Sequence, residues 1–416
     1  MAHSAGYVAS TLVTFALVPF LLRAFSPADY GVWLVSLSAS AALGTVTIAL
    51  WWVVSREVAG AEENGDPPRA LVADVFAATL IVACVGALLL FLAATNGLIG
   101  TASSDEQRTV LRLAGALFFW EQMTACAVAV LSGRRQFVSL NTIVVGSTMV
   151  RAASIVFVLL RGGTLLTVAL LHVAFTAIGA LALLCTMLVA TPWLRTLRPV
   201  APFSALRVHL RFASQLQFAA VITAGTNQLV PLIVSRMFGS AAVVPLYIGL
   251  RVPQAASSLA HRVTEAAYPM LVQLTNRGGI DAVRPVVARS MRWGIALALL
   301  AALALFLAAP LILRFWLGTY PPEALVLCRL AAAAFLFETI SLPLDVALMA
   351  AGRAGVVLGI VSMTAIVQMG TLVWLLRAMG VRAAGIALLA NCVVYAAAHL
   401  VVADRIGVFR WRRSPA

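Results

Sequence analysis

The sequence predicts an all-α, polytopic membrane protein with about twelve transmembrane helices, arranged as two parallel six-helix repeats around a central cavity. Three observations predict this class: the apolar composition, a series of long apolar runs, and an internal repeat. Of the 416 residues, 62% are hydrophobic and 11% are charged, and the mean hydropathy is +1.01. Because soluble proteins are about one quarter charged, this composition excludes a water-soluble multidomain enzyme.

The apolar runs are each long enough to cross the hydrocarbon core as a helix, which takes about 20 residues. Their apolar character is continuous and lacks the alternation of a β-barrel. We predict spans at residues 5–23, 31–54, 71–95, 109–131, 139–160, 165–190, 212–235, 243–268, 290–313, 325–349, 355–377 and 384–403. The first run is interpreted as an uncleaved helix, since the second run follows almost at once.

The basic residues indicate the orientation of the chain. All 29 of them are arginine, and the absence of lysine excludes a Walker-type phosphate loop. Arginines concentrate in the even-numbered loops and the C-terminal tail, and positive residues favour the cytoplasmic side. We therefore expect both termini in the cytoplasm, and we interpret the net charge of +14 as a topology signal and not as a nucleic-acid interface.

Cysteine and histidine give no metal signature. The five cysteines lie inside apolar runs without Cys-x-x-Cys spacing, and the five histidines are scattered along the chain. We expect no metal, no disulfide framework and no cofactor. An ion gradient, of protons or sodium, is the energy source that we expect for transport.

An internal repeat divides the chain into halves. Residues 112–121 match residues 329–338 at an offset of 217, including Arg112 with Arg329 and Glu121 with Glu338. Each repeat holds six predicted helices, and an even number means that both halves enter the membrane from the same side. The proline-rich, basic connection at 191–211 separates them, which predicts a lobe at 1–200 and a lobe at 201–416.

Helix 8 of the predicted series has a polar stripe. Its members share one helical face, being spaced by three or four residues: Tyr247, Arg251, Gln254, Ser258, Arg262 and Glu265. A polar stripe at membrane depth faces protein or water, so we interpret it as the wall of a basic cavity. The alternative is a structural stripe in which Arg262 pairs with Glu265 and Arg251 extends outward.

Helices 1, 2 and 7 supply further polar positions, including Asn227 on helix 7. Hydroxyl and amide side chains also serve helix packing, so these positions are weaker indications. Helices 1, 2, 7 and 8 hold equivalent places in the two repeats. Together they are predicted to line the cavity.

Carboxylates at membrane depth are candidates for ion coupling. Glu121 and Arg151 lie on one helical hairpin, where they can form a buried ion pair. The equivalent region of the second repeat has no arginine, so Glu338 is predicted to be unpaired and to exchange a proton, with Asp345 on the same face. A hydrogen-bonded neutral acid is the alternative. Glu265 of the stripe completes the set.

These residues resemble those of the polysaccharide-biosynthesis flippases, the O-antigen and exopolysaccharide members of the multidrug/oligosaccharidyl-lipid/polysaccharide exporter superfamily. Residues 21–33, which read LLRAFSPADYGVW, look like that family's first external turn. Residues 267–269, 315–318 and 347–352 are also similar, so the resemblance extends over nearly the whole chain.

The resemblance implies a cargo and a site. The cargo is a polyprenyl-pyrophosphate-linked oligosaccharide, moved from the inner to the outer leaflet of the bacterial cytoplasmic membrane by alternating access. The family's cationic cavity implies that Arg251 and Arg262 bind the pyrophosphate, with Arg151 as a third group. A polysaccharide polymerase and chain-length proteins are implied partners, together with membrane lipid.

Two other classes of function remain open. A multidrug exporter of the same superfamily would favour acidic groups in its cavity, and the arginine stripe disfavours it. A polyprenyl-dependent glycosyltransferase or polymerase needs catalytic groups on sizeable external loops. The connections between the predicted spans are short, so we expect no enzyme activity.

Overall fold

The computed structural model describes residues 2–64, 68–196, 204–265 and 268–407. Every regular element in these ranges is a helix, which confirms the predicted all-α class. The longer helices are α1 Ala2–Ala24, α2 Pro27–Gly44, α3 Ile48–Asn64, α4 Arg69–Thr95, α5 Asp105–Gly133, α6 Phe137–Leu160, α7 Leu165–Ala190, α8 Ser204–Phe238, α9 Val243–Glu265, α10 Tyr268–Leu317, α11 Pro322–Ala350, α12 Ala354–Met379 and α13 Arg382–Ile406. Three short 3₁₀ helices are η1 Thr45–Thr47, η2 Pro192–Thr196 and η3 Ser240–Ala242.

The predicted span at 31–54 was wrong as a single helix, since it is divided between α2, η1 and α3, whereas each of the others lies mainly on one helix. Ten helices of the described chain are long and apolar enough to cross a membrane. The other two predicted spans fall on α1, whose described apolar part is the shorter segment Thr11–Ala24, and on α9. Helix α9 carries the arginine stripe, which lowers its hydropathy. The protein is therefore a multi-pass membrane protein, with ten spans that qualify by length and composition where twelve were predicted.

The chain divides into two compact units, unit 1 from Met1 to Val244 and unit 2 from Pro245 to Ala416. Helix α8 belongs to unit 1, where it packs against α2, α3 and α4. In that contact Gln217 Nε2 donates to the carbonyl oxygen of Thr45 over 2.5 Å. The lobes predicted from the sequence divide earlier, at residue 200, and that division stays a prediction about the repeat.

The helices follow the internal repeat closely. Helices α5 and α11 begin at Asp105 and Pro322, which are 217 residues apart, and they end the same distance apart at Gly133 and Ala350. The starts of α6 and α12, and of α7 and α13, are also separated by 217 residues. The offset that was visible in the sequence therefore relates whole helices, and the two copies run in the same chain direction.

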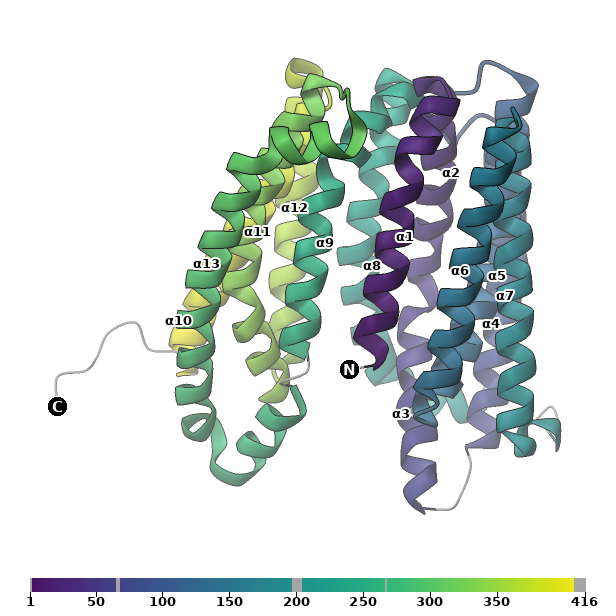
Figure 1. Ribbon diagram of the computed structural model, residues 1–416. Helices are drawn as coiled ribbons and strands as arrows, with labels where there is room; N and C mark the ends of the chain where they lie inside the picture. Colours follow the sequence, from purple (N-terminus) through teal and green to yellow (C-terminus); the bar gives the residue numbers. More distant parts are fainter. Residues whose placement is uncertain (1, 65–67, 197–203, 266–267, 408–416) are drawn as a thin grey trace. The chain divides into compact units, whose positions relative to one another are not determined.

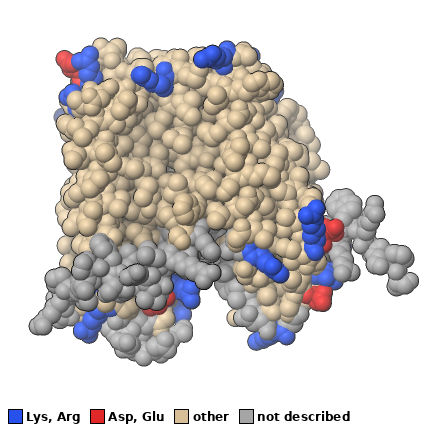
Figure 2. Space-filling model, turned by 180° about the vertical axis from the view of Figure 1, so that it is seen from behind, with Lys and Arg blue, Asp and Glu red and all other residues tan. Residues whose placement is uncertain are grey.

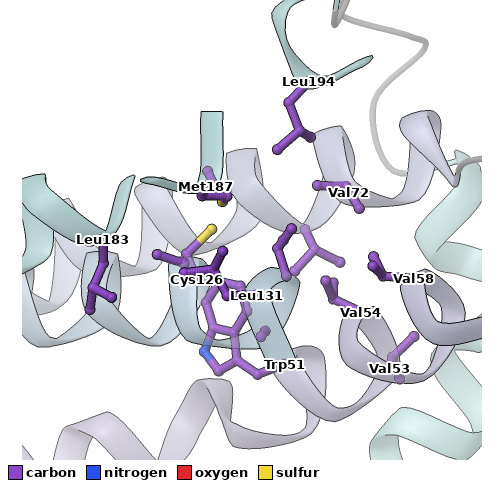
Figure 3. Packing of buried hydrophobic residues seen from close by; sticks show 14 of the residues in the cluster. Trp51, Val53, Val54, Val58, Val72, Cys126, Leu131, Leu183, Met187 and Leu194 are labelled. Atoms are coloured by element: carbon purple, nitrogen blue, oxygen red, sulfur yellow. The ribbon is translucent and has the colours of Figure 1, made fainter. Parts of the chain in front are cut away.

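Unit 1 contains a hydrophobic core where α3, α4, α5 and α7 meet (Figure 3). Its side chains include Trp51, Val53, Val54, Val58, Val72, Cys126, Leu131, Leu183, Met187 and Leu194. Dense packing of this kind holds the α3–α5 pair rigid. The pair matters for the site because α5 carries Glu121.

Exposed apolar side chains cover the middle of the helices, and charged ones gather near their ends (Figure 2). In unit 2 the long helix α10 extends the predicted span at 290–313 back to Tyr268. The sequence had suggested a loop in that stretch. Gly279 has a φ of 64°, which glycine adopts readily, and the chain bends in this part of α10 (Figure 1).

Candidate functional site

Each unit contains a serine that donates a hydrogen bond to a glutamate from a neighbouring helix. In unit 1, Ser40 Oγ of α2 donates to Glu121 Oε2 of α5 over 2.5 Å. In unit 2, Ser257 Oγ of α9 donates to Glu338 Oε2 of α11 over 2.6 Å. Both serines and both glutamates are related by the 217-residue offset. We call these the Ser–Glu contacts, and they show that the repeat preserves a polar interaction and not only helix lengths.

Local sequence explains how α2 is positioned in unit 1. Ser26 caps α2 by accepting from the Asp29 backbone N–H over 3.2 Å, and Pro27 occupies the first helical position. Asp29 Oδ1 then accepts from Gln107 Nε2 at the start of α5 over 2.8 Å. The residues that gave the family resemblance thus fix the start of α2 against α5.

Glycines allow close helix contact in both units. A Cβ atom at Gly31 of α2 would lie 1.9 Å from the carbonyl oxygen of Ser240. A Cβ at Gly249 of α9 would lie 2.6 Å from Leu327 Cβ of α11. In unit 2 the contact at Gly249 joins α9 to α11, the two helices that carry Ser257 and Glu338, whereas in unit 1 the contact at Gly31 joins α2 to η3.

Histidine makes the second Ser–Glu contact different from the first. His261 Nε2 lies 2.9 Å from Glu338 Oε1, and the two side chains are 42% and 30% exposed. The residue 217 positions earlier is Gly44, which has no side chain to offer. Glu338 therefore has a partner on each oxygen, and the prediction that it is unpaired was wrong. The helix that follows Glu338 has no arginine at the equivalent position, and His261 of α9 is the partner instead.

Glu121 and Arg151 do not form the direct ion pair that the sequence suggested. Arg151 Nη1 of α6 lies 3.3 Å from His172 Nε2 and 3.4 Å from Thr176 Oγ1, both on α7. Glu121 instead accepts from Ser40, although it still interacts electrostatically with Arg151. The arginine is thus held by an imidazole and a hydroxyl, in a partly buried position within unit 1.

A second carboxylate of α11, Asp345, lies near a second histidine. His399 Nε2 of α13 lies 3.5 Å from Asp345 Oδ1, and the His399 side chain is fully buried. The Tyr395 ring lies 4.3 Å from the His399 ring. Two of the carboxylates of α11, Glu338 and Asp345, thus each lie near an imidazole from a different helix.

The predicted cavity stripe is described in part. The Arg251 guanidinium carbon lies 5.3 Å from the centre of the Tyr247 ring, a cation–π contact along one face of α9. Gln254 of α9 and Asn227 of α8 are exposed. Arg262 lies on α9 with its side chain outside the described residues, and Glu265 is the last residue of that helix. The central cavity itself remains a prediction.

Sequence reasoning missed Ser40, Ser257, His261 and His399 as polar partners. The signal for three of them was present, because the repeat offset relates Ser40 to Ser257, and His261 follows Ser257 by one helical turn. In the described chain no group of three or more His, Cys, Asp or Glu side chains is arranged to hold a metal ion.

Fold and polar contacts together define a multi-pass helical membrane protein whose helices and Ser–Glu contacts recur at an offset of 217 residues. No protein-family model matches the chain, and no curated protein matches it. Solved structures do match over almost its full length. The lipid II flippase MurJ in an inward closed conformation aligns with a TM-score of 0.74 at 11% identity, over 98% of this chain and 87% of that chain.

Two transporters give similar alignments. An inward-facing multidrug resistance MATE family transporter of the MOP superfamily aligns with a TM-score of 0.69 at 13% identity, over 96% of this chain and 94% of that chain. A Vibrio cholerae MATE transporter aligns with a TM-score of 0.60 at 18% identity, over 97% and 98%. The chain therefore has the fold that these MATE transporters and MurJ share.

Proposed function

We propose that the protein is a flippase that moves a polyprenyl-pyrophosphate-linked oligosaccharide from the cytoplasmic to the outer leaflet of the bacterial inner membrane. Movement would occur by alternating access and would serve surface polysaccharide assembly. The observation that carries the proposal is the combination of the fold shared with a lipid II flippase and arginines placed within membrane helices. The protein would break no covalent bond and so would not act as an enzyme.

Arginine suits the chemistry of this cargo. A pyrophosphate carries adjacent anionic oxygens, and a guanidinium can donate two parallel hydrogen bonds to them. In unit 2 the Tyr247 ring packs on Arg251, and in unit 1 His172 and Thr176 hold Arg151. These contacts orient each guanidinium. Arg262, Gln254 and Asn227 complete the proposed binding set.

Substitution of Arg251 tests this assignment. In proteoliposomes, Arg251→Ala is expected to slow leaflet movement of a fluorescent polyprenyl-pyrophosphate sugar by at least about tenfold, since a hydrogen bond to a charged group contributes about 1.5–3 kcal/mol. The measurement is the fraction of labelled sugar that becomes accessible to an impermeant quencher with time.

Arg161→Ala is the matched control. Arg161 also stacks on an aromatic ring, with 4.4 Å between its guanidinium carbon and the centre of the Phe157 ring, but it lies at the end of α6 outside the polar stripe. We expect this variant to keep the wild-type rate. Wild-type movement in Arg251→Ala, or equal loss in both variants, would contradict the role of Arg251.

A multidrug exporter is the second candidate, and it has specific support. MATE transporters share the fold, and α11 presents Glu338 and Asp345 as partly exposed carboxylates. A cationic drug would bind such groups, whereas a pyrophosphate would avoid them. Active efflux of a cationic dye from cells, without movement of the labelled lipid-sugar, would favour this alternative.

Proton coupling through unit 2 completes the proposal. Glu338 is the proposed acceptor, with His261 and Ser257 as its hydrogen-bond partners and Asp345 on the same helix. Glu121 and Glu265 were also predicted from the sequence, but coupling is assigned to Glu338, because Gly44 stands at the position in unit 1 that His261 has in unit 2. The arginine distribution supports cytoplasmic termini. The family resemblance supports partnership with a polysaccharide polymerase and chain-length proteins.

A further inference from the structure

Helix α10 has one exposed apolar face that runs from Trp293 to Phe315. Its exposed members are spaced by three or four residues: Trp293, Leu297, Leu300, Leu303, Leu307, Leu311 and Phe315. At 1.5 Å per residue this face is about 33 Å long, close to the roughly 30 Å of hydrocarbon in a bilayer. The face therefore spans the lipid chains, and Trp293 and Phe315 mark its two boundaries.

Arg289 and Arg292 lie directly before Trp293, and both are exposed. They are within about 6 Å of Trp293 along the helix axis. The headgroup layer on each side of the hydrocarbon is also several ångströms thick. Both guanidinium groups are thus at the depth of lipid phosphates, next to an indole of the kind that favours the interface.

The two arginines repel each other, being three residues apart on one helix. In the described part of the chain neither forms an ion pair, and Arg292 Nε donates only to the Ala288 carbonyl of its own helix over 3.3 Å. Arg284, on the same helix, differs from them because it pairs with Asp281 at 2.7 Å and donates to the Gly407 carbonyl. An anion placed between Arg289 and Arg292 would offset their repulsion, and the lipid headgroup layer supplies one.

We propose that Arg289 and Arg292 bind the headgroup of an anionic phospholipid, with Trp293 packed at the boundary of its acyl chains. A zwitterionic lipid fits less well, because its own ammonium group would meet the second guanidinium. The arginines contact a lipid of the leaflet where α10 enters the membrane. This lipid is distinct from the proposed cargo, which is assigned to the stripe on α9.

The test measures lipid binding and not transport. Phosphatidylglycerol added to the detergent-purified protein is expected to raise Tm, and phosphatidylcholine is not. Arg289→Gln with Arg292→Gln should weaken the apparent affinity for phosphatidylglycerol about 25-fold, since each arginine at an anionic surface contributes a factor of about five. The double variant should keep the wild-type Tm in phosphatidylcholine.

A charge-matched control replaces Arg314 and Arg377 by glutamine. These exposed arginines are near the ends of α10 and α12, and the control should keep the phosphatidylglycerol effect. An unchanged effect in the Arg289/Arg292 variant, equal loss in the control, or an equal Tm rise with inorganic phosphate would overturn the proposal.

Quenching by brominated lipid gives a second measurement if the double variant fails to fold. In the otherwise wild-type protein, brominated phosphatidylglycerol should quench Trp293 fluorescence more than brominated phosphatidylcholine does. The part of the quenching that is due to Trp293 is obtained by subtracting the quenching measured in the Trp293→Phe variant. Equal quenching by the two lipids would refute selection for the anionic headgroup.

Discussion

Glu338→Gln is expected to abolish the pH dependence of transport, which is a larger functional effect than that of Arg251→Ala. The substitution keeps the shape of the side chain and the contact with Ser257, but it removes the carboxylate that is the proposed proton acceptor beside His261. In the wild-type protein, acidification outside the vesicle is expected to accelerate export. Over two pH units the occupancy of one proton site changes by at most about 100-fold, and the variant should show none of this change.

The repeat supplies the matched control for this experiment. Glu121→Gln alters the equivalent Ser–Glu contact in unit 1, where Gly44 stands in place of the histidine. We expect a slower rate with the wild-type pH profile. Rates would be measured with labelled cargo in proteoliposomes across a series of imposed pH gradients. A normal pH profile in Glu338→Gln, or its loss in Glu121→Gln alone, would show that coupling lies elsewhere.

Gly31→Ala is expected to destabilise the protein by about 3 kcal/mol, the upper part of the usual range for overpacking. The new Cβ would lie 1.9 Å from a backbone carbonyl oxygen, that of Ser240. That segment cannot easily retreat, because Ser240 is held by Thr101 and by the Ala28 carbonyl. The expected readouts are a lower Tm and a smaller yield of monodisperse protein in detergent.

Gly60→Ala on α3 controls for the general effect of replacing a helical glycine. A Cβ at Gly60 meets nothing within 4 Å, and alanine has the higher helix propensity, by about 1 kcal/mol. This variant should therefore equal or exceed the wild-type Tm. If Gly31→Ala were as stable as Gly60→Ala, the close approach of α2 to η3 would not exist in the protein.

The sequence predicted the helices well because each one leaves a local signal. An apolar run of about 20 residues is enough to predict a membrane-spanning helix. The 217-residue offset correctly related α5 to α11. The polar stripe on α9 lowered the hydropathy of that span, but the helix was still predicted, at residues 243–268. The stretch before residue 290 was less predictable, since its continuation of α10 depends on how Gly279 bends the chain.

The polar contacts were harder to predict because they join side chains from different helices. The pairing of Glu338 with His261 links α9 to α11 across 77 positions, and no local pattern reports that distance. The sequence analysis named Glu338 as a candidate but did not identify its partner His261. Arg151 shows the same limit, since neighbouring α7 provided His172 and Thr176 where an acidic partner on α5 was expected.

The position of α8 has a consequence for fragment complementation. By sequence this helix opens the second repeat, yet it is integrated with the first six spans. Two polypeptides separated near residue 200 would leave α2 and α3 without the cover that α8 provides. Co-expressed halves separated after Val244 should reassemble in better yield, because that cut leaves each compact unit with all of its own helices.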